Sequence, residues 1–128
     1  MQKKNDDKKK RGYYRNKLKG RQSKAEIGYM PLDEFRNNDK DSRRHPVYIF
    51  AQKGNDYLFF VVTHSEITSG TKNLRLAENP NSADDKVSFI RPKYKQQNRR
   101  YFGKVKPDWY LNEYDKKTLQ KIIDEIMN

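Results

Sequence analysis

Two histidines, His45 and His64, are the residues best suited to acid–base chemistry in this chain of 128 residues, and they are its only histidines. The unperturbed pKa of an imidazole is about 6.5, so each ring can donate or accept a proton near neutral pH. Arg44, Thr63 and Ser65 lie directly beside them in the sequence and add a guanidinium and two hydroxyl groups. A guanidinium can hold a phosphate with two hydrogen bonds, and hydroxyl groups can support the charge that develops on it. These five candidate catalytic residues therefore point to phosphoryl transfer.

A predicted β-hairpin brings the two histidines together. Its apolar strands, Val47–Ala51 and Tyr57–Thr63, are rich in β-branched and aromatic residues, and Gly54-Asn55 between them is typical of a two-residue turn. With such a turn, residues at equal distances from it oppose one another. The predicted pairs are Ile49 with Phe60, Val47 with Val62, Pro46 with Thr63, and His45 with His64. The Cβ atoms of opposed residues are about 4.5–5.5 Å apart, so the imidazoles would lie side by side unless a bulge shifts the register. Histidines are also common at strand ends, and their opposition alone does not establish catalysis.

The hairpin strands carry apolar residues on both faces, which predicts a central position in a sheet that is covered on both sides. Before the hairpin, we expect an edge strand at 27–32, where Pro31 removes a backbone donor, and a mobile loop at 33–44. After it, turn-rich composition predicts loops at 66–71 and 78–85, in which Asp84 and Asp85 would be a solvated pair. The remaining expectations are short strands at 72–77 and 86–91, a basic polar turn at 93–98, and a strand at 99–106 with Gly103 as the candidate bulge position.

The C-terminal segment is predicted to be a helix at about 113–127. Asn112 can cap it, and Asp115 three residues later suits the positive end of the helix dipole. An apolar stripe with helical spacing should pack on the sheet; it consists of Leu119, Ile122, Ile123 and Ile126. The predicted fold is therefore α+β but mostly β: a small, strongly bent sheet or partly open antiparallel barrel of about five to six strands with a C-terminal helix.

The positive charge is concentrated at the N-terminus. Residues 1–24 contain eleven Lys or Arg and two Asp, a net charge of +9 out of the total of +12. This segment is too polar to fold alone, so we predict a basic disordered tail followed by one domain at 25–128. A basic tail binds polyanions by counterion release, and Arg11 and Arg15, which flank two tyrosines, are candidate RNA-binding residues. A tail of this kind can instead serve only to keep the protein soluble.

Several function classes are disfavoured by composition. The chain has no cysteine, which excludes disulfides and thiolate metal sites, and two histidines without carboxylates at ligand spacing predict neither a metal nor another cofactor. No apolar run is long enough to cross a membrane, and the N-terminus lacks the apolar region of a signal peptide. We therefore expect a cytoplasmic protein with no membrane partner.

A second candidate surface lies at 93–106, where basic and aromatic residues alternate. Such a segment offers charges for a nucleic-acid backbone and rings on which bases can stack. The candidate RNA-binding residues are Lys93, Lys95, Arg99, Arg100 and Lys104. Tyr101 and Phe102 are adjacent, so at least one of them should face the core, and Trp109 is predicted to be a packing anchor against the helix.

The order of elements resembles the MazF/PemK/Kid family of toxin endoribonucleases over residues 27–127. The segment from Arg44 to Ile49 is similar to the family's Arg-Pro-Val strand opening, although His45 here precedes the proline. The segment Val61–Ser65 resembles the strand that ends in the family's functional threonine. Residues 109–111 followed by Asp115 and the Leu119–Ile123 run resemble the family's closing helix, and Gly28-Tyr29 with Leu32 resemble its first strand, without the usual Gly-Asp-Val.

This resemblance implies an SH3-like barrel with a C-terminal helix and a metal-independent cut in single-stranded RNA. The ribose 2′-hydroxyl would attack the neighbouring phosphate and leave a 2′,3′-cyclic phosphate. The family's arginine role would fall on His45, or on Arg44 if the alignment slips by one, and its threonine role on Thr63. The resemblance also implies a homodimer and a cognate antitoxin that covers the region from Arg44 to Thr63.

Two other functions remain open at this stage. A non-catalytic SH3-like module with a basic arm that holds nucleic acid explains the charge equally well, but not the meeting of both histidines. A protein-interaction partner would show little salt-dependent RNA binding. The sequence does not decide which histidine would act as acid and which as base.

Overall fold

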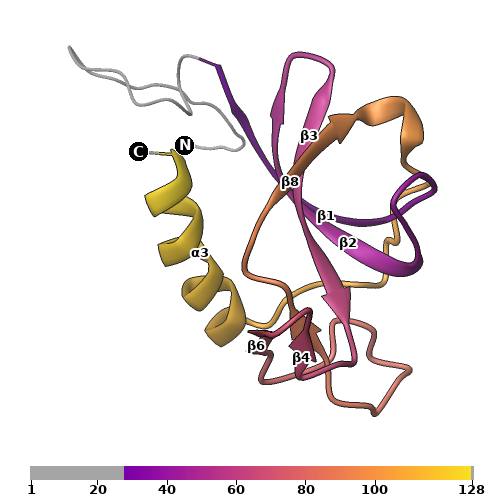
Figure 1. Ribbon diagram of the computed structural model, residues 1–128, viewed down its shortest axis with the longest axis vertical. Coiled ribbons are helices and arrows are strands. Elements are labelled where there is room, and N and C mark those ends of the chain that lie inside the picture. Colours follow the sequence, from indigo (N-terminus) through magenta and orange to yellow (C-terminus); the bar gives the residue numbers. More distant parts are fainter. Residues whose placement is uncertain (1–27, 128) are drawn as a thin grey trace.

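A computed structural model describes residues 28–127, which form a mostly antiparallel sheet packed against one C-terminal helix (Figure 1). The main sheet contains β1 (Met30–Asn38), β2 (Ser42–Lys53), β3 (Asp56–Thr63), β6 (Leu74–Arg75), β7 (Phe89–Ile90) and β8 (Lys95–Asn98). A separate two-stranded ribbon contains β4 (Ile67–Thr68) and β5 (Thr71–Lys72), and the helices are the 3-10 turn η2 (Arg99–Tyr101) and α3 (Glu113–Met127). The predicted α+β, mostly β class is confirmed. The predicted basic tail, with Arg11 and Arg15, lies outside the described residues.

The long hairpin of β2 and β3 is central, as predicted. The strand order is β1-β2-β3-β7-β6, and β8 also pairs with β3. Apolar residues of the hairpin form two clusters, one on each face. One includes Phe50, Phe60 and the buried side of α3, and the other joins Val47, Ile49 and Phe59. The hairpin is therefore covered on both faces.

The predicted hairpin register holds only near the turn. Gly54 adopts a positive φ of 60°, and Ala51 pairs with Leu58 as expected, but the register shifts between Ile49 and Ala51. Beyond this bulge the pairs are Ile49 with Phe59, Tyr48 with Phe60, and Val47 with Val61. The predicted pairs of Ile49 with Phe60 and of Val47 with Val62 are therefore wrong. Because both faces of these strands are buried, the apolar pattern does not favour one register over the next.

The polar segment 33–44, predicted to be a mobile loop, instead supplies most of β1 and the start of β2. Residues Glu34 to Asn37 pair with β2, and the Phe35 side chain is buried. The reversal is fixed by Asn38, which is fully buried: its Oδ1 accepts from the backbone N–H groups of Lys40 (2.8 Å) and Asp41 (3.1 Å). Its Nδ2 donates to Gln97 Oε1 (2.7 Å). The predicted strand at 27–32 overlaps β1 only from Met30 onward.

The segments 93–98 and 99–106 differ from their predicted turn and strand. The expected turn at 93–98 contains β8, which pairs with the first half of β3, while β7 pairs with its last two residues. The expected strand at 99–106 begins with η2 and then runs beside the outer edge of β1. There Gly103 N donates to Asn37 O (2.9 Å), and Lys106 N donates to Phe35 O (2.8 Å). The short strands predicted at 72–77 and 86–91 are present as β6 and β7, with two residues each.

The C-terminal helix is confirmed with its cap. Asn112 Oδ1 accepts from the backbone N–H of Asp115 (2.8 Å), and Leu119 and Ile123 are buried against the sheet. Asp115 has an additional role, because its buried carboxylate accepts from the backbone N–H groups of Ala77 (2.8 and 3.0 Å) and Glu78 (3.2 Å). This contact ties the start of α3 to the segment that follows β6.

Candidate functional site

Three of the five candidate catalytic residues, Thr63, His64 and Ser65, lie where β3 ends, beside the short strands β4 and β6 (Figure 1). The other two, Arg44 and His45, belong to β2. Thr63 is the last residue of β3 and pairs with Phe89 of β7. Only 6% of Thr63 is exposed. Its Oγ1 accepts a hydrogen bond from the Ser65 backbone N–H (3.2 Å), which turns the chain immediately after the strand. His64, between them, is exposed.

The imidazole of His64 contacts the loop that precedes β7. Its Nδ1 lies 2.9 Å from the Val87 carbonyl oxygen. A carbonyl oxygen can only accept, so we assign a proton to Nδ1. On the other side of the ring, Nε2 lies 3.5 Å from Asp84 Oδ2. The ring is therefore held between a backbone carbonyl and a carboxylate.

Asp84 is not part of a solvated pair, contrary to the sequence-based prediction. Its Oδ1 accepts from the Lys86 backbone N–H (3.0 Å), and its Oδ2 faces His64. The hydrogen bond from Lys86 N–H lowers the pKa of Asp84, and the positive charge of His64 lowers it further. Asp84 therefore stays ionised throughout the pH range in which an imidazole titrates.

His45 does not face His64, so the predicted histidine pair is corrected. Because of the register shift at Phe50, Val47 pairs with Val61, where the recorded pairing of β2 with β3 ends. Counted from that pair, His45 is two residues away and His64 three, so the two histidines are out of register. The His45 side chain is exposed. The backbone of Arg44 belongs to β2, and its side chain lies outside the described part of the chain. We use "histidine end" for Thr63, His64 and Ser65 together with Asp84 and Val87.

The turn after Ser65 is fixed by Asn73, which sequence reasoning missed. Asn73 is buried, and its Nδ2 donates to Ser65 O (2.9 Å) and to Thr68 Oγ1 (2.8 Å). Its backbone N–H donates to Glu66 O (2.8 Å). Asp84 and the Val87 carbonyl were also missed. The Asn and Asp spacing of the loop indicated turns, but a backbone carbonyl partner leaves no mark in a sequence.

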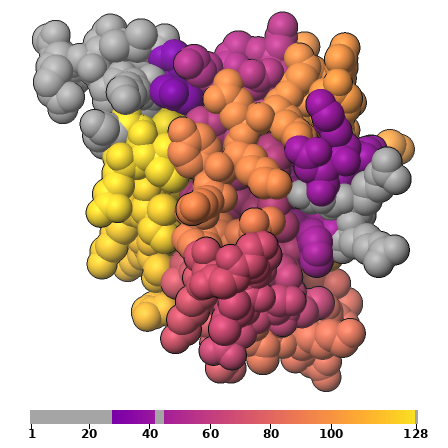
Figure 2. Space-filling view, in the orientation of Figure 1, coloured from indigo at the N-terminus to yellow at the C-terminus, as the bar shows by residue number. Residues whose placement is uncertain are grey.

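The predicted RNA-binding residues of the segment 93–106 lie along β8, η2 and the extended chain after them. Lys93, Arg99, Arg100 and Lys104 are exposed, and Lys95 is half-buried. Figure 2 shows this segment, in orange, on the surface between the yellow helix and the violet β1. None of these five residues belongs to the histidine end.

On this surface, the ring of Tyr101 contacts two cations. Lys40 Nζ lies 4.6 Å and Arg100 Cζ 4.9 Å from the centroid of its ring, and Arg100 Nη2 donates to Tyr101 Oη (2.8 Å). This hydrogen bond and the charge of Arg100 lower the pKa of Tyr101. Phe102 packs edge-on against the rings of Tyr57 and Phe59, as expected for one member of the pair. We call Lys40, Arg100 and Tyr101 the "tyrosine face".

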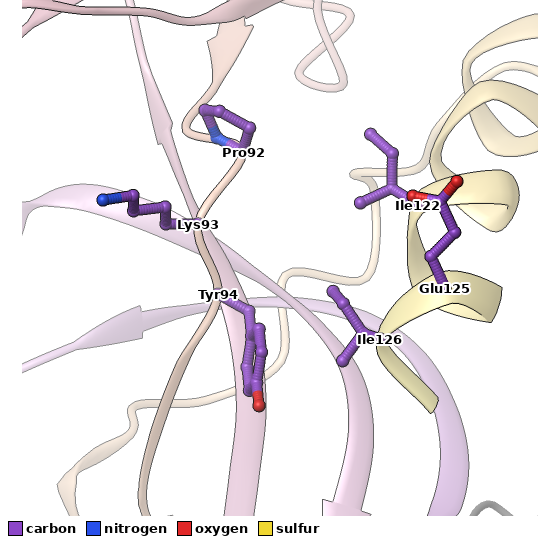
Figure 3. A pocket seen from close by; sticks show the side chains of 6 residues that line it. All are labelled: Pro92, Lys93, Tyr94, Ile122, Glu125 and Ile126. Atoms are coloured by element: carbon purple, nitrogen blue, oxygen red, sulfur yellow. The ribbon is translucent and has the colours of Figure 1, made fainter. Parts of the chain in front are cut away.

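A cavity of about 440 Å³ lies between the β7–β8 connection and α3 (Figure 3). Pro92, Tyr94, Ile122 and Ile126 supply apolar walls, while Lys93 extends away from the helix. Glu125 is the remaining lining residue. The cavity contains neither a histidine nor a hydroxyl group of the histidine end, so we do not place the chemistry there.

Among residues 28–127, no group of three or more His, Cys, Asp or Glu side chains could hold a metal ion. No helix in this part of the chain is long and apolar enough to cross a membrane. Comparisons of the chain with protein-family models, with curated proteins and with solved structures found no match. Function is therefore inferred from the residues and their arrangement.

Proposed function

We propose that the protein is a metal-independent endoribonuclease of the toxin type, which cuts single-stranded RNA at the histidine end. The observation that carries this proposal is the placement of an exposed, oriented imidazole directly after a strand-ending threonine. His64 Nδ1 is fixed by the Val87 carbonyl at 2.9 Å, and His45 lies near the start of β2. The two imidazoles are thus carried by the two arms of the central hairpin, both at the end away from its turn.

The chemistry requires a base for the 2′-hydroxyl, an acid for the leaving 5′-oxygen and support for the charged phosphorane. The two imidazoles are suited to both proton transfers near neutral pH. Arg44 is proposed to hold the phosphate, and Ser65, which is exposed, to donate a hydrogen bond to it. Thr63 is only 6% exposed, so a phosphate would reach no more than the tip of its side chain.

We also propose that the fold is an SH3-like, partly open barrel. It is supported by the way the chain returns after η2: β8 pairs with β3, and the following segment bonds to the far edge of β1 through Gly103 and Lys106. Opposite edges of the sheet are thereby brought towards closure. Asn38 supports the same curvature, because it joins the β1–β2 turn to Gln97 of β8.

Binding of the RNA backbone is proposed for the exposed cations of the segment 93–106. Lys93, Arg99, Arg100 and Lys104, with the less exposed Lys95, would contact phosphates without reading sequence. Arg11 and Arg15 of the basic tail would extend this contact. The proposal also includes the remaining implications of the family resemblance, which are a homodimer, a cognate antitoxin over the Arg44–Thr63 region and a cytoplasmic location.

The decisive experiment is incubation of the purified full chain, with EDTA, with a labelled single-stranded RNA and with a long natural RNA. We expect fragments that end in 2′,3′-cyclic phosphate, and loss of these fragments in His45→Ala and in His64→Ala. Lys121→Ala is the matched control, because Lys121 is exposed on α3 and outside the proposed site. Intact natural RNA with the wild-type chain contradicts the enzyme proposal.

A second candidate function is a non-catalytic module that holds RNA or DNA, and the tyrosine face favours it. Two cations over one aromatic ring provide charge and a surface for stacking without any catalytic group. This alternative predicts tight, salt-sensitive binding of RNA that stays intact, and full affinity in the His45→Ala, His64→Ala double variant.

A further inference from the structure

The imidazole of His64 has an acceptor at each of its nitrogens. Val87 O lies 2.9 Å from Nδ1, and Asp84 Oδ2 lies 3.5 Å from Nε2. With Nδ1 protonated, a neutral ring would turn the lone pair of Nε2 towards the carboxylate, which places two electron-rich atoms against each other. A ring that carries both protons instead forms an ion pair with Asp84. The surroundings of His64 therefore offer a partner for a proton on each ring nitrogen.

The carboxylate of Asp84 is held in place by its own loop. The Lys86 N–H binds Oδ1 (3.0 Å) and leaves Oδ2 for the imidazole. The backbone N–H of Asp84 donates to Asn81 O (3.0 Å), and Asn79 Nδ2 donates to Lys86 O (3.0 Å). Asn81 is bridged in turn to Trp109, which packs on the core. The position of the acid is thus set by the fold rather than by His64 alone.

We propose that Asp84 is a positioning residue that pairs with the Nε2–H of His64 and thereby orients this ring as the general acid of the RNA cleavage. This inference rests on the proposed function. It also assigns the roles left open by the sequence, because His45 is then the base. Without Asp84, His64 would keep the Val87 contact at Nδ1 and would lose the partner of Nε2.

Atoms and protons balance in the proposed step. His45 takes the proton from the 2′-hydroxyl, the 2′-oxygen forms a bond to phosphorus, and the bond from phosphorus to the 5′-oxygen breaks. The proton on His64 Nε2 passes to that 5′-oxygen, which leaves as a hydroxyl. The Nε2–H is available for this transfer because a 3.5 Å separation from Asp84 is that of an ion pair and not of a good hydrogen bond. Exchange with solvent restores both rings.

Other charged groups on the neighbouring elements do not replace Asp84. The structure places Asp84 in ion-pair contact with the ring. Other ionisable residues of the neighbouring segments include Glu66 after β3, Lys72 on β5, Arg75 on β6, Arg91 after β7, and Asp85 and Lys86 in the loop. Lys86 has the same charge sign as an imidazolium and acts on Asp84, whose pKa it helps to lower. The pH dependence of RNA cleavage should therefore change when Asp84 is replaced.

The first test compares rate–pH profiles of RNA cleavage for the wild type, Asp84→Asn and Asp85→Asn. Asparagine keeps an oxygen that can accept from Lys86 N–H, so Asp84→Asn removes the charge and spares the loop. We expect its cleavage rate to fall about tenfold on the alkaline limb of the profile, with rates near wild type at acid pH. Asp85→Asn makes the same charge change at the adjacent exposed position and should leave the profile unchanged.

The second test does not depend on activity. Ring ¹⁵N chemical shifts of His64 in the full-length labelled protein report the proton on each nitrogen. We expect the Nε2 signal of Asp84→Asn to differ from that of wild type and of Asp85→Asn, because its carboxylate partner is gone, with Nδ1 protonated in all three. Profiles and ring signals that are the same in both variants would overturn the role of Asp84 while leaving the ribonuclease proposal intact. A wild-type chain that cuts no RNA overturns the proposed function. An Nε2 signal that is the same in Asp84→Asn and wild type disproves the pairing of His64 with Asp84, whether or not RNA is cut.

Discussion

The histidine end and the tyrosine face hold their functional side chains in different ways. At the histidine end, hydrogen bonds to the backbone fix the geometry: Val87 O orients His64, and Lys86 N–H orients Asp84. At the tyrosine face, Lys40 and Arg100 lie over an aromatic ring near the surface. Proton transfer needs atoms at defined positions, whereas attraction of a phosphate backbone needs only charge. The contrast is what the proposed function requires, with RNA cleavage at the first region and RNA affinity at the second.

The prediction with the largest expected effect separates RNA cleavage from RNA binding. His64→Gln removes the titrating ring, and loss of one acid–base group should reduce RNA cleavage by about 100-fold or more. RNA binding should stay within about twofold, since none of the tyrosine-face side chains changes. Cleavage assays and filter binding on the same preparations measure both quantities, and Lys121→Gln on the exposed side of α3 is the control. Parallel losses of cleavage and binding would remove the distinction between the two regions.

The next prediction tests the support of the histidine end. Asn73→Ala removes two hydrogen bonds, to Ser65 O and Thr68 Oγ1, and should lower the free energy of unfolding by about 1–3 kcal/mol. Cleavage should fall even where the variant is folded, because the turn after Ser65 loosens, while RNA binding is retained. Urea unfolding measures the first effect, with the exposed Ser82→Ala as control. Wild-type stability and activity would show that Asn73 is not a support.

The sequence predicted the hairpin turn and the capped helix because each rests on local signals. Gly54 supplies the positive φ of the turn, and Asn112 caps α3 as its position suggested. The register beyond Phe50 could not be predicted, since buried residues on both strand faces accept either alignment. The bulge there puts His45 and His64 out of register, so one local irregularity altered the predicted site.

Other parts of the site and fold depend on contacts between distant segments. The polar residues of β1 resemble a loop in sequence because one face of that strand is exposed, and only Phe35 and Asn38 are fully buried in its second half. His64 is held by a residue 20 positions away and by a carbonyl 23 positions away. Such partners become neighbours only after β7 has paired with β3. The sequence therefore nominated Thr63, His64 and Ser65 as candidates but gave no sign of the groups that orient them.

At the tyrosine face we expect a smaller effect, which falls on RNA binding and not on RNA cleavage. Replacing Lys40 and Arg100 with alanine should weaken RNA binding severalfold and reduce the slope of log affinity against log salt by about 0.7 for each phosphate that the protein no longer neutralises. The catalytic rate at saturating RNA should be unchanged. Binding isotherms at several salt concentrations provide the test, and Lys117→Ala with Lys121→Ala on α3 is a control with the same charge change. A slope equal to that of the control would exclude these cations from the RNA interface.

The smallest effect concerns the phenol of Tyr101 itself. Arg100 lowers its pKa by donating a hydrogen bond to Oη and by its charge, and Lys40 adds to the effect. Both cations stabilise the phenolate, so Arg100→Ala should raise the pKa of Tyr101 towards its ordinary value. A proton or carbon NMR titration of the ring measures this shift directly. Arg99→Ala, an exposed neighbour of equal charge, should move the titration less. An equal shift in both variants would mean that general charge, rather than the 2.8 Å hydrogen bond from Arg100, sets the behaviour of this ring.

The same phenol can report where RNA binds. If RNA phosphates bind at the tyrosine face, added single-stranded RNA should raise the pKa of Tyr101, since an anion near Oη opposes formation of the phenolate. The His64 ring signals should then stay unchanged when the RNA is too short to reach the histidine end. That pair of results would assign affinity and chemistry to separate parts of the molecule, whereas a response of both rings to the same short RNA would place the two tasks on one surface.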